Sequence, residues 1–137
     1  MVIVDSSVWI DAINGVPSIE AIWLHRWIDR EPIGLTTLIL CEVLQGMRSD
    51  KRFREVRDEL QRLPVFENYS TGLAIKAAEN YRFLRAKGIT IRKTIDCMIA
   101  THCIAHGFQL LHHDSDFDPF EEHLGLDVLD PSVSALS

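Results

Sequence analysis

The clearest indication of the fold is the stretch Met1-Val-Ile-Val-Asp5-Ser6-Ser7-Val-Trp9-Ile-Asp11. Its β-branched run, Val2–Val4, is too short for a helix and fits a buried strand that stops on the carboxylate of Asp5. Ser6 and Ser7 are good helix N-caps, so a helix is expected to follow. In open α/β sheets such a junction is where ligands bind. Taken alone, Asp5 is more simply explained as a residue that caps or charges the helix start.

The length and composition of the chain fit one soluble domain covering residues 1–137. A chain of 137 residues with 47% hydrophobic and 25% charged residues can bury a core without metal or disulfides. No apolar run reaches the roughly 18 residues that span a bilayer, and no basic leader is present, so we expect a cytoplasmic protein. Cys41, Cys97 and Cys103 have no C-x-x-C spacing, and we expect them to be buried thiols.

The net charge of −6 argues against a protein that coats nucleic acid without selectivity. Acids that gather around divalent cations would nevertheless account for part of this charge. The main basic surface is expected on the outer face of a helix at 50–63, which carries Lys51, Arg52, Arg54, Arg57 and Arg62. Such a face is usually only solvated, although a polyanion can rest on it.

The rest of the chain alternates between helical and extended patterns. Apolar spacing and punctuation by Gly and Pro predict further helices at 19–29, 38–46, 50–63, 71–87 and 92–107. Short apolar runs predict strands at 33–35, 64–66, 108–111 and 126–129. This alternation indicates an α/β fold with a mostly parallel sheet and right-handed crossovers. Trp9, Trp23 and Trp27 are expected in the core, the alternative being a groove between the first two helices that holds a partner helix.

Three further acids occupy places comparable to that of Asp5. Asp114 follows the strand at 108–111, as Asp5 follows the first strand. Glu42 interrupts an apolar helical run and does not lie on an obviously solvated face, so it is as well explained by a ligand role as by a surface position. Asp96 lies in the first turn of a helix, where the dipole favours an acid in any case.

These acids are expected to meet, because strand C-termini and helix N-termini gather at one edge of a parallel sheet. Neighbouring carboxylates cannot all stay ionised without compensation, and Mg²⁺ or Mn²⁺ is the natural counter-ion for a set of oxygen ligands. Such a site positions a water and stabilises the leaving oxygen in phosphodiester hydrolysis. A lysine or arginine that already filled the gap between the acids would argue against this interpretation.

Four motifs in register resemble one known family. They are V-D-S-S-V-W-I-D at 4–11, T-T-x-x-x-x-E-V-x-x-G at 36–46, D-x-x-I-A at 96–100 and L-L-x-x-D-x-D-F at 110–117. Each motif is weak alone, but together they span nearly the whole chain and resemble the PIN domain of VapC-type toxin ribonucleases. The resemblance implies a three-layer α/β/α fold with a central, mostly parallel sheet.

The resemblance also implies a set of site residues. The catalytic, metal-binding acids would be Asp5, Glu42, Asp96 and Asp114, and Asp116 would add a ligand or a supporting contact. Hydroxyl groups that orient the carboxylates or the water would come from Ser6, Ser7 and Thr94. Asp11 matches an acid for which a structural role is expected. His112 and His113 replace the small polar residues common in the family, and we expect passive positions for them rather than contact with the scissile phosphate.

From the same resemblance we expect a Mg²⁺- or Mn²⁺-dependent endoribonuclease toxin. Its substrate would be single-stranded or looped RNA (tRNA, rRNA or mRNA), and the protein would form a homodimer. A VapB-like antitoxin would inhibit it by laying a C-terminal segment across the groove.

Other functions fit the sequence less well. A catalytically silent PIN-like binding module is the main alternative, although all four acids are present. A haloacid-dehalogenase-like phosphatase would need a second aspartate where Ser7 stands. The pair His102-x-x-x-His106 has the spacing of zinc proteases but lacks their glutamate, and we expect an exposed helix face there. No P-loop or G-x-S-x-G motif is present.

Overall fold

The computed structural model describes residues 1–132. Its strands are β1 (Val2–Val4), β2 (Ile33–Thr36), β3 (Val65–Phe66), β4 (Gln109–Leu111) and β5 (Asp127–Val128). Its helices are α1 (Ser6–Ile13), α2 (Ile19–Trp27), α3 (Thr37–Gln45), α4 (Asp50–Leu60), α5 (Thr71–Ala86), α6 (Thr94–His106) and α7 (Asp118–Leu124). A 3₁₀ turn, η1 (Ser115–Phe117), lies between β4 and α7.

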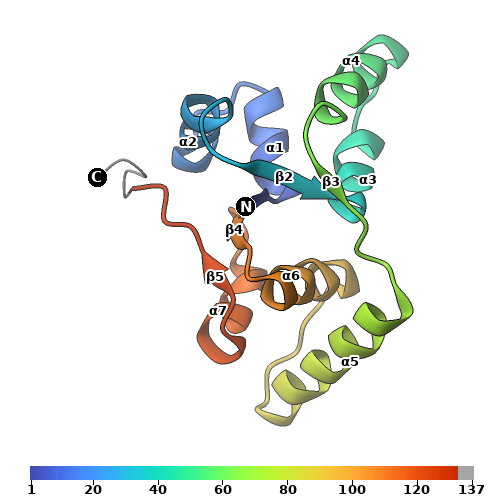
Figure 1. Cartoon of the computed structure of the whole chain (residues 1–137), viewed down its shortest axis with the longest axis vertical. Coiled ribbons are helices and arrows are strands. Elements are labelled where there is room, and N and C mark those ends of the chain that lie inside the picture. The colour runs from blue at the N-terminus through green and yellow to red at the C-terminus, as the bar shows by residue number, and fades with distance from the viewer. Residues whose placement is uncertain (133–137) are drawn as a thin grey trace.

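The strands form one parallel sheet in the order β3-β2-β1-β4-β5. The central strand β1 pairs through Val2 with Ile33 of β2 and through Ile3 with Leu110 of β4. Helices α1 to α4 lie on one side of the sheet and α5 to α7 on the other (Figure 1). This arrangement follows from right-handed crossovers, since the chain runs outward from β1 to β3 and then returns past β1 to β5. The expected α/β fold is confirmed.

The core surrounds β1, whose three residues are all buried. All three tryptophans are buried in this core, as predicted. None of the described helices is long and apolar enough to cross a membrane. The side chains of Ser18, Thr36, Ser49 and Ser70 cap helices by accepting backbone N–H groups, as their sequence positions indicate.

Several helix boundaries and caps in the structure differ from those predicted from the sequence. The N-cap of α1 is Asp5, as in the simpler explanation of this residue, rather than Ser6 or Ser7, because the extended backbone of Asp5 lets its carboxylate accept the Ser7 N–H. Helix α4 ends at Leu60, before the expected 63, and α6 begins at Thr94 rather than at 92. Two elements were not predicted: η1, which contains Asp116, and α7, which follows it.

Two side chains have a different environment from the one expected. Cys41 is exposed rather than buried, because it lies on the outer side of α3, whereas Cys97 and Cys103 are buried. His102 is only 3% exposed, although its helix face was expected to be solvated. It is covered by the rings of Phe66 and Phe108, each with its centroid 6.0 Å away, and by His106 at 4.2 Å.

Candidate metal centre

Asp5 lies where β1 ends and α1 begins, and its two carboxylate oxygens do different things. Oδ2 accepts hydrogen bonds from the Ser7 backbone N–H at 3.2 Å and from the Ser7 hydroxyl at 2.8 Å. Oδ1 is buried and has no hydrogen-bond partner within residues 1–132. Burial raises the pKa of the Asp5 carboxyl above its usual range, and the bonds from Ser7 oppose this only in part. The cap therefore orients the carboxylate and leaves one oxygen available.

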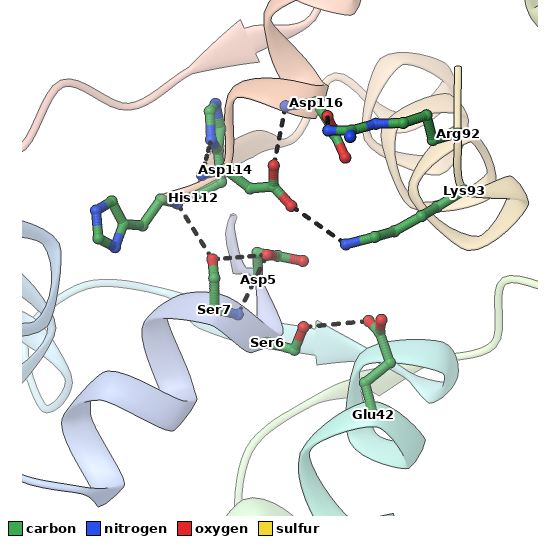
Figure 2. A network of polar contacts seen from close by, with 10 residues as sticks. Asp5, Ser6, Ser7, Glu42, Arg92, Lys93, His112, Asp114 and Asp116 are labelled. Carbon is green, nitrogen blue, oxygen red and sulfur yellow. Dashed lines mark hydrogen bonds and ion pairs between the residues drawn. The ribbon is translucent and has the colours of Figure 1, made fainter. Parts of the chain in front are cut away.

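Asp114 repeats this arrangement at the end of β4. Its Oδ1 accepts the Asp116 backbone N–H at 2.9 Å and so caps η1. The Asp114 backbone N–H donates to Nδ1 of His112 at 3.1 Å, which fixes the loop. The second oxygen, Oδ2, faces the gap toward Asp5 and lies 3.7 Å from Nζ of Lys93 (Figure 2). Capping again takes one oxygen and directs the other toward the centre.

Glu42 reaches the same gap from α3. The Ser6 hydroxyl donates a hydrogen bond of 3.2 Å to Oε1 of Glu42, joining α1 to α3. Figure 2 shows the Glu42 carboxylate directed upward from α3 toward Asp5 and Lys93. Burial raises the pKa of Glu42, and the negative charge of Asp5 raises it further.

Asp96, in the first turn of α6, is the acid whose titration changes most clearly. Its side chain is only 4% exposed, and its Oδ2 has no hydrogen-bond partner in the described part of the chain. Burial and then the charge of Asp5 raise the pKa of Asp96 to about 7, even though Lys93 acts in the opposite direction. One carboxylate oxygen each of Asp96, Asp114 and Asp116 lie within 4.8 Å of one another.

Two cations border this group of acids. Nζ of Lys93 lies 3.7 Å from Asp114, and the guanidinium of Arg92 lies 3.0 Å from Oδ1 of Asp116 (Figure 2). Their side chains are 58% and 76% exposed, so they lie on the solvent side of the acids. Lys93 compensates the cluster only in part, because a buried oxygen of Asp5 and one of Asp96 still have no partner within the described residues. The gap is therefore bordered by cations rather than filled by them.

The other residues named from the sequence lie around the cluster. The side chain of Thr94 is exposed, lines a cavity between α5 and α6, and makes no hydrogen bond to an acid among residues 1–132. Asp11 bonds through Oδ2 to Nδ1 of His113 at 3.2 Å, linking α1 to the loop after β4. The ring of His112 packs on Phe117 with centroids 5.0 Å apart. The contacts of His112 and His113 hold the loop after β4 in place.

Sequence reasoning missed the two cations. The pair Arg92-Lys93 stands directly before the D-x-x-I-A motif, but it was assigned to the start of a helix. Basic residues are disfavoured at a helix N-terminus by the dipole, and this mismatch was the available signal.

The chemistry of the cluster suits a hard divalent cation. Its ligand atoms are carboxylate oxygens, which Mg²⁺ and Mn²⁺ prefer, and hydroxyl and backbone N–H groups already hold those carboxylates in place. Burial raises the pKa of the Asp5 and Asp96 carboxyls, and the charge of Asp5 raises that of Asp96 further. Each of the two also has a buried oxygen without a partner within residues 1–132, which a bound cation would compensate. The residues present therefore fit a divalent metal.

Comparison with known proteins identifies relatives across most of the chain. The model of the family described as "PIN domain" matches residues 2–122. VapC ribonuclease Mb1587 of Mycobacterium bovis is 31% identical over 121 residues, covering 86% of this chain and 90% of that protein. Ribonuclease VapC11 of Mycobacterium tuberculosis matches with the same identity and coverage.

Solved structures share the fold at low identity. A chain in the crystal structure of VapBC2 from Rickettsia felis, bound to a DNA fragment from its promoter, superposes with a TM-score of 0.74 at 21% identity. That match covers 94% of this chain and 98% of the other. A chain of VapBC-1 from nontypeable Haemophilus influenzae gives 0.73 at 17% identity, covering 97% and 100%. The predicted three-layer α/β/α architecture is confirmed.

Proposed function

This chain belongs to the PIN-domain family, and from that premise we propose that it is a Mg²⁺- or Mn²⁺-dependent endoribonuclease. The observation that carries the proposal is the group of oriented acids at the carboxyl edge of the sheet, with buried oxygens that have no partner within residues 1–132. The VapC names of the relatives support RNA as the substrate. The match to the PIN-domain family argues against a haloacid-dehalogenase-like phosphatase, which Ser7 already disfavoured.

The proposed metal ligands are Asp5, Glu42, Asp96 and Asp114, with Asp116 as a further ligand or supporting contact. A bound divalent cation supplies charge that activates water and stabilises the leaving oxygen. The protein itself holds the carboxylates in position. The Ser7 bonds fix the rotamer of Asp5, and the Ser6 bond holds Glu42, so that the free oxygens need no rearrangement. Thr94 lies at the edge of this arrangement, and its role as a supporting hydroxyl stays a prediction.

We also propose that the activity is that of a cytoplasmic toxin inhibited by a VapB-like antitoxin. A groove of about 680 Å³ runs between α1, α2 and α4, with Trp9, Leu24 and Val56 in its walls and charged residues at its rim. An apolar groove with this border suits an amphipathic helix. The VapBC titles of the solved structures support a partner of this kind.

Two further expectations belong to this proposal. One sheet and one continuous core over the described residues support a single domain covering 1–137. Exposed apolar side chains on α5, Ile75 and Phe83, support a homodimer. The molar mass from light scattering during gel filtration tests the second expectation, with a monomer at micromolar concentration as the contrary result.

The central test is metal-dependent cleavage of a mixed RNA pool by purified protein. We expect cleavage with Mn²⁺ or Mg²⁺, none in excess EDTA, and at least a 100-fold loss in Asp5→Asn and Asp114→Asn. Asp127→Asn is the matched control, because it removes an exposed carboxylate from β5. Equal cleavage by all these proteins would refute the metal centre. Absence of cleavage by any of them, with tight binding of a partner, would favour the silent binding module.

A further inference from the structure

We propose that Arg92 and Lys93 bind backbone phosphates of the RNA substrate, exchanging their ion pairs with Asp116 and Asp114 for phosphate when a divalent cation enters the cluster. This inference rests on the proposed ribonuclease function. It assigns a substrate-binding role to two residues that lie outside the predicted acidic set.

Arg92 and Lys93 lie between the acids and solvent. They occupy the segment immediately before α6, the helix that carries Asp96. Lys93 is the N-cap residue of α6, but its ammonium group has only donors and cannot accept a backbone N–H. Its side chain extends over the gap (Figure 2). Arg92 and Lys93 are largely exposed, whereas the acids they pair with are mostly covered. A strand of RNA that approached the acids from solvent would therefore meet these cations first.

Electrostatics supply a further argument. A divalent cation held by Asp96, Asp114 and Asp116 would bind two of the carboxylates that Arg92 and Lys93 now contact. Like charges at such distances repel, so the attraction that holds each side chain on its aspartate would weaken. Both side chains are long and exposed, and each could turn to a neighbouring phosphate without breaking a buried contact.

The basic residues on and just after α4 pair with different acids from those that Arg92 and Lys93 contact. The basic face predicted from the sequence as a resting place for a polyanion is largely neutralised by its own helix. Local ion pairs join Lys51 and Arg52 to Glu55, Arg57 to Asp58 and Arg62 to Glu59. No metal would compete for those acids. Arg92 and Lys93 instead pair with acids that a metal would occupy, so their charge becomes available where the scissile phosphate must lie.

The test measures RNA binding separately from cleavage. Fluorescence anisotropy of a labelled single-stranded RNA is recorded with Ca²⁺ as the divalent ion, and a gel verifies that the RNA remains intact. The double variant Arg92→Gln/Lys93→Gln is compared with the wild type. The matched control is Lys51→Gln/Arg54→Gln, which removes the same charge from exposed positions on α4. Thermal melts establish that all three proteins are folded.

We expect the site variant to bind RNA about 10-fold more weakly at 0.1 M salt, with the control within about twofold of the wild type. The slope of log K against log salt should fall by roughly 0.7 for each lost phosphate contact, as for single strands. Affinity for Mn²⁺ alone, measured by calorimetry, should stay equal or rise in the site variant, because a competing positive charge has been removed.

Two results would overturn the inference while leaving the ribonuclease intact. One is a wild type that cleaves RNA alongside a site variant with unchanged affinity and salt slope. The other is a site variant whose Mn²⁺ affinity falls sharply, which would make the cations structural partners of the acids. A wild type that neither cleaves nor binds RNA with any divalent ion overturns the proposed function itself, and this inference with it.

Discussion

The two ends of α6 each bury an ionisable side chain, but in different surroundings. Near its N-terminus, Asp96 lies among other carboxylates, and burial, followed by the charge of Asp5, raises its pKa to about 7. Near its C-terminus, His102 lies among the rings of Phe66, His106 and Phe108, and burial lowers its pKa to about 4. In both cases a buried polar atom has no hydrogen-bond partner within residues 1–132.

The two side chains meet the cost of burial in different ways. Burial alone disfavours the charged form at both ends of the helix. His102 avoids the cost by staying neutral and packing on aromatic rings, so packing explains its position. Asp96 cannot do the same above pH 7, because it then carries a charge beside other charges of the same sign. Only the second arrangement calls for an added cation.

The largest expected effect is on RNA cleavage, which should depend on Asp96 near the N-terminus of α6 and not on His102 near its C-terminus. Asp96→Asn should lower RNA cleavage at least 100-fold, because it removes a charged ligand, while His102→Phe should stay within about threefold. Initial rates on one RNA at saturating Mn²⁺ measure both. A comparable loss in His102→Phe would mean that the aromatic cluster takes part in function and would break the comparison.

The next effect concerns metal and stability. Mn²⁺ at 100 times its dissociation constant should stabilise the wild type by about 2.7 kcal/mol, because it binds only the folded site. His102→Phe should show the same rise in Tm, and Asp96→Asn much less of it. Without metal, Asp96→Asn should melt about 3–8 °C above the wild type at pH 7.5, since it relieves repulsion between acids. A metal-free variant that melts below the wild type would contradict this account.

A third effect is the pH dependence of the free energy of unfolding without metal. Asp96 and His102, at the two ends of α6, should contribute to it with opposite signs. The pKa of Asp96 rises from 3.8 to about 7 on folding, so the folded state binds more protons between these values and stability falls as pH rises. The pKa of His102 falls from 6.5 to about 4 on folding, so the unfolded state binds more protons and stability rises with pH over that range.

Urea unfolding from pH 4.5 to 7.5 separates the two contributions. Relative to the wild type, Asp96→Asn should remove the component that falls with pH, and His102→Phe the component that rises. A free-energy difference between wild type and Asp96→Asn that does not change with pH would show that Asp96 titrates normally.

The smallest expected effect distinguishes the hydroxyl groups around the acids. Ser6→Ala removes the bond to Glu42 and should lower cleavage about three- to tenfold. Thr94→Ala should change it less than twofold, because the Thr94 side chain is exposed. Measuring both against Ser132→Ala, a change in the C-terminal turn, controls for loss of a hydroxyl as such. A larger loss in Thr94→Ala than in Ser6→Ala would reverse this assignment.

Much of the architecture was readable from local patterns. The β-branched run before Asp5, the apolar run before Asp114 and the Ser and Thr caps predicted most strands and helix starts, because these depend on neighbouring residues. The order of the elements then implied the parallel sheet and its carboxyl edge. The acids predicted to meet were Asp5, Glu42, Asp96 and Asp114. In the structure, carboxylate oxygens of Asp96, Asp114 and Asp116 lie within 4.8 Å of one another, and the metal-binding roles of all these acids stay predictions.

Other features were beyond local patterns. His102 and Cys41 were assigned to the wrong environments, because burial depends on which elements pack over a helix face and not on the helix sequence alone. The short helix α7 was missed because a helix of this length leaves little periodic signal.

The order of residues was enough to predict that acids follow two strands and begin or interrupt two helices, because neighbouring residues set the strand-to-helix boundaries. The tertiary structure was needed to show that Arg92 and Lys93 border the acids and that His102 is covered by aromatic rings. These outcomes join residues far apart in the chain. Their energies depend on distance and burial, which exist only once the chain has folded.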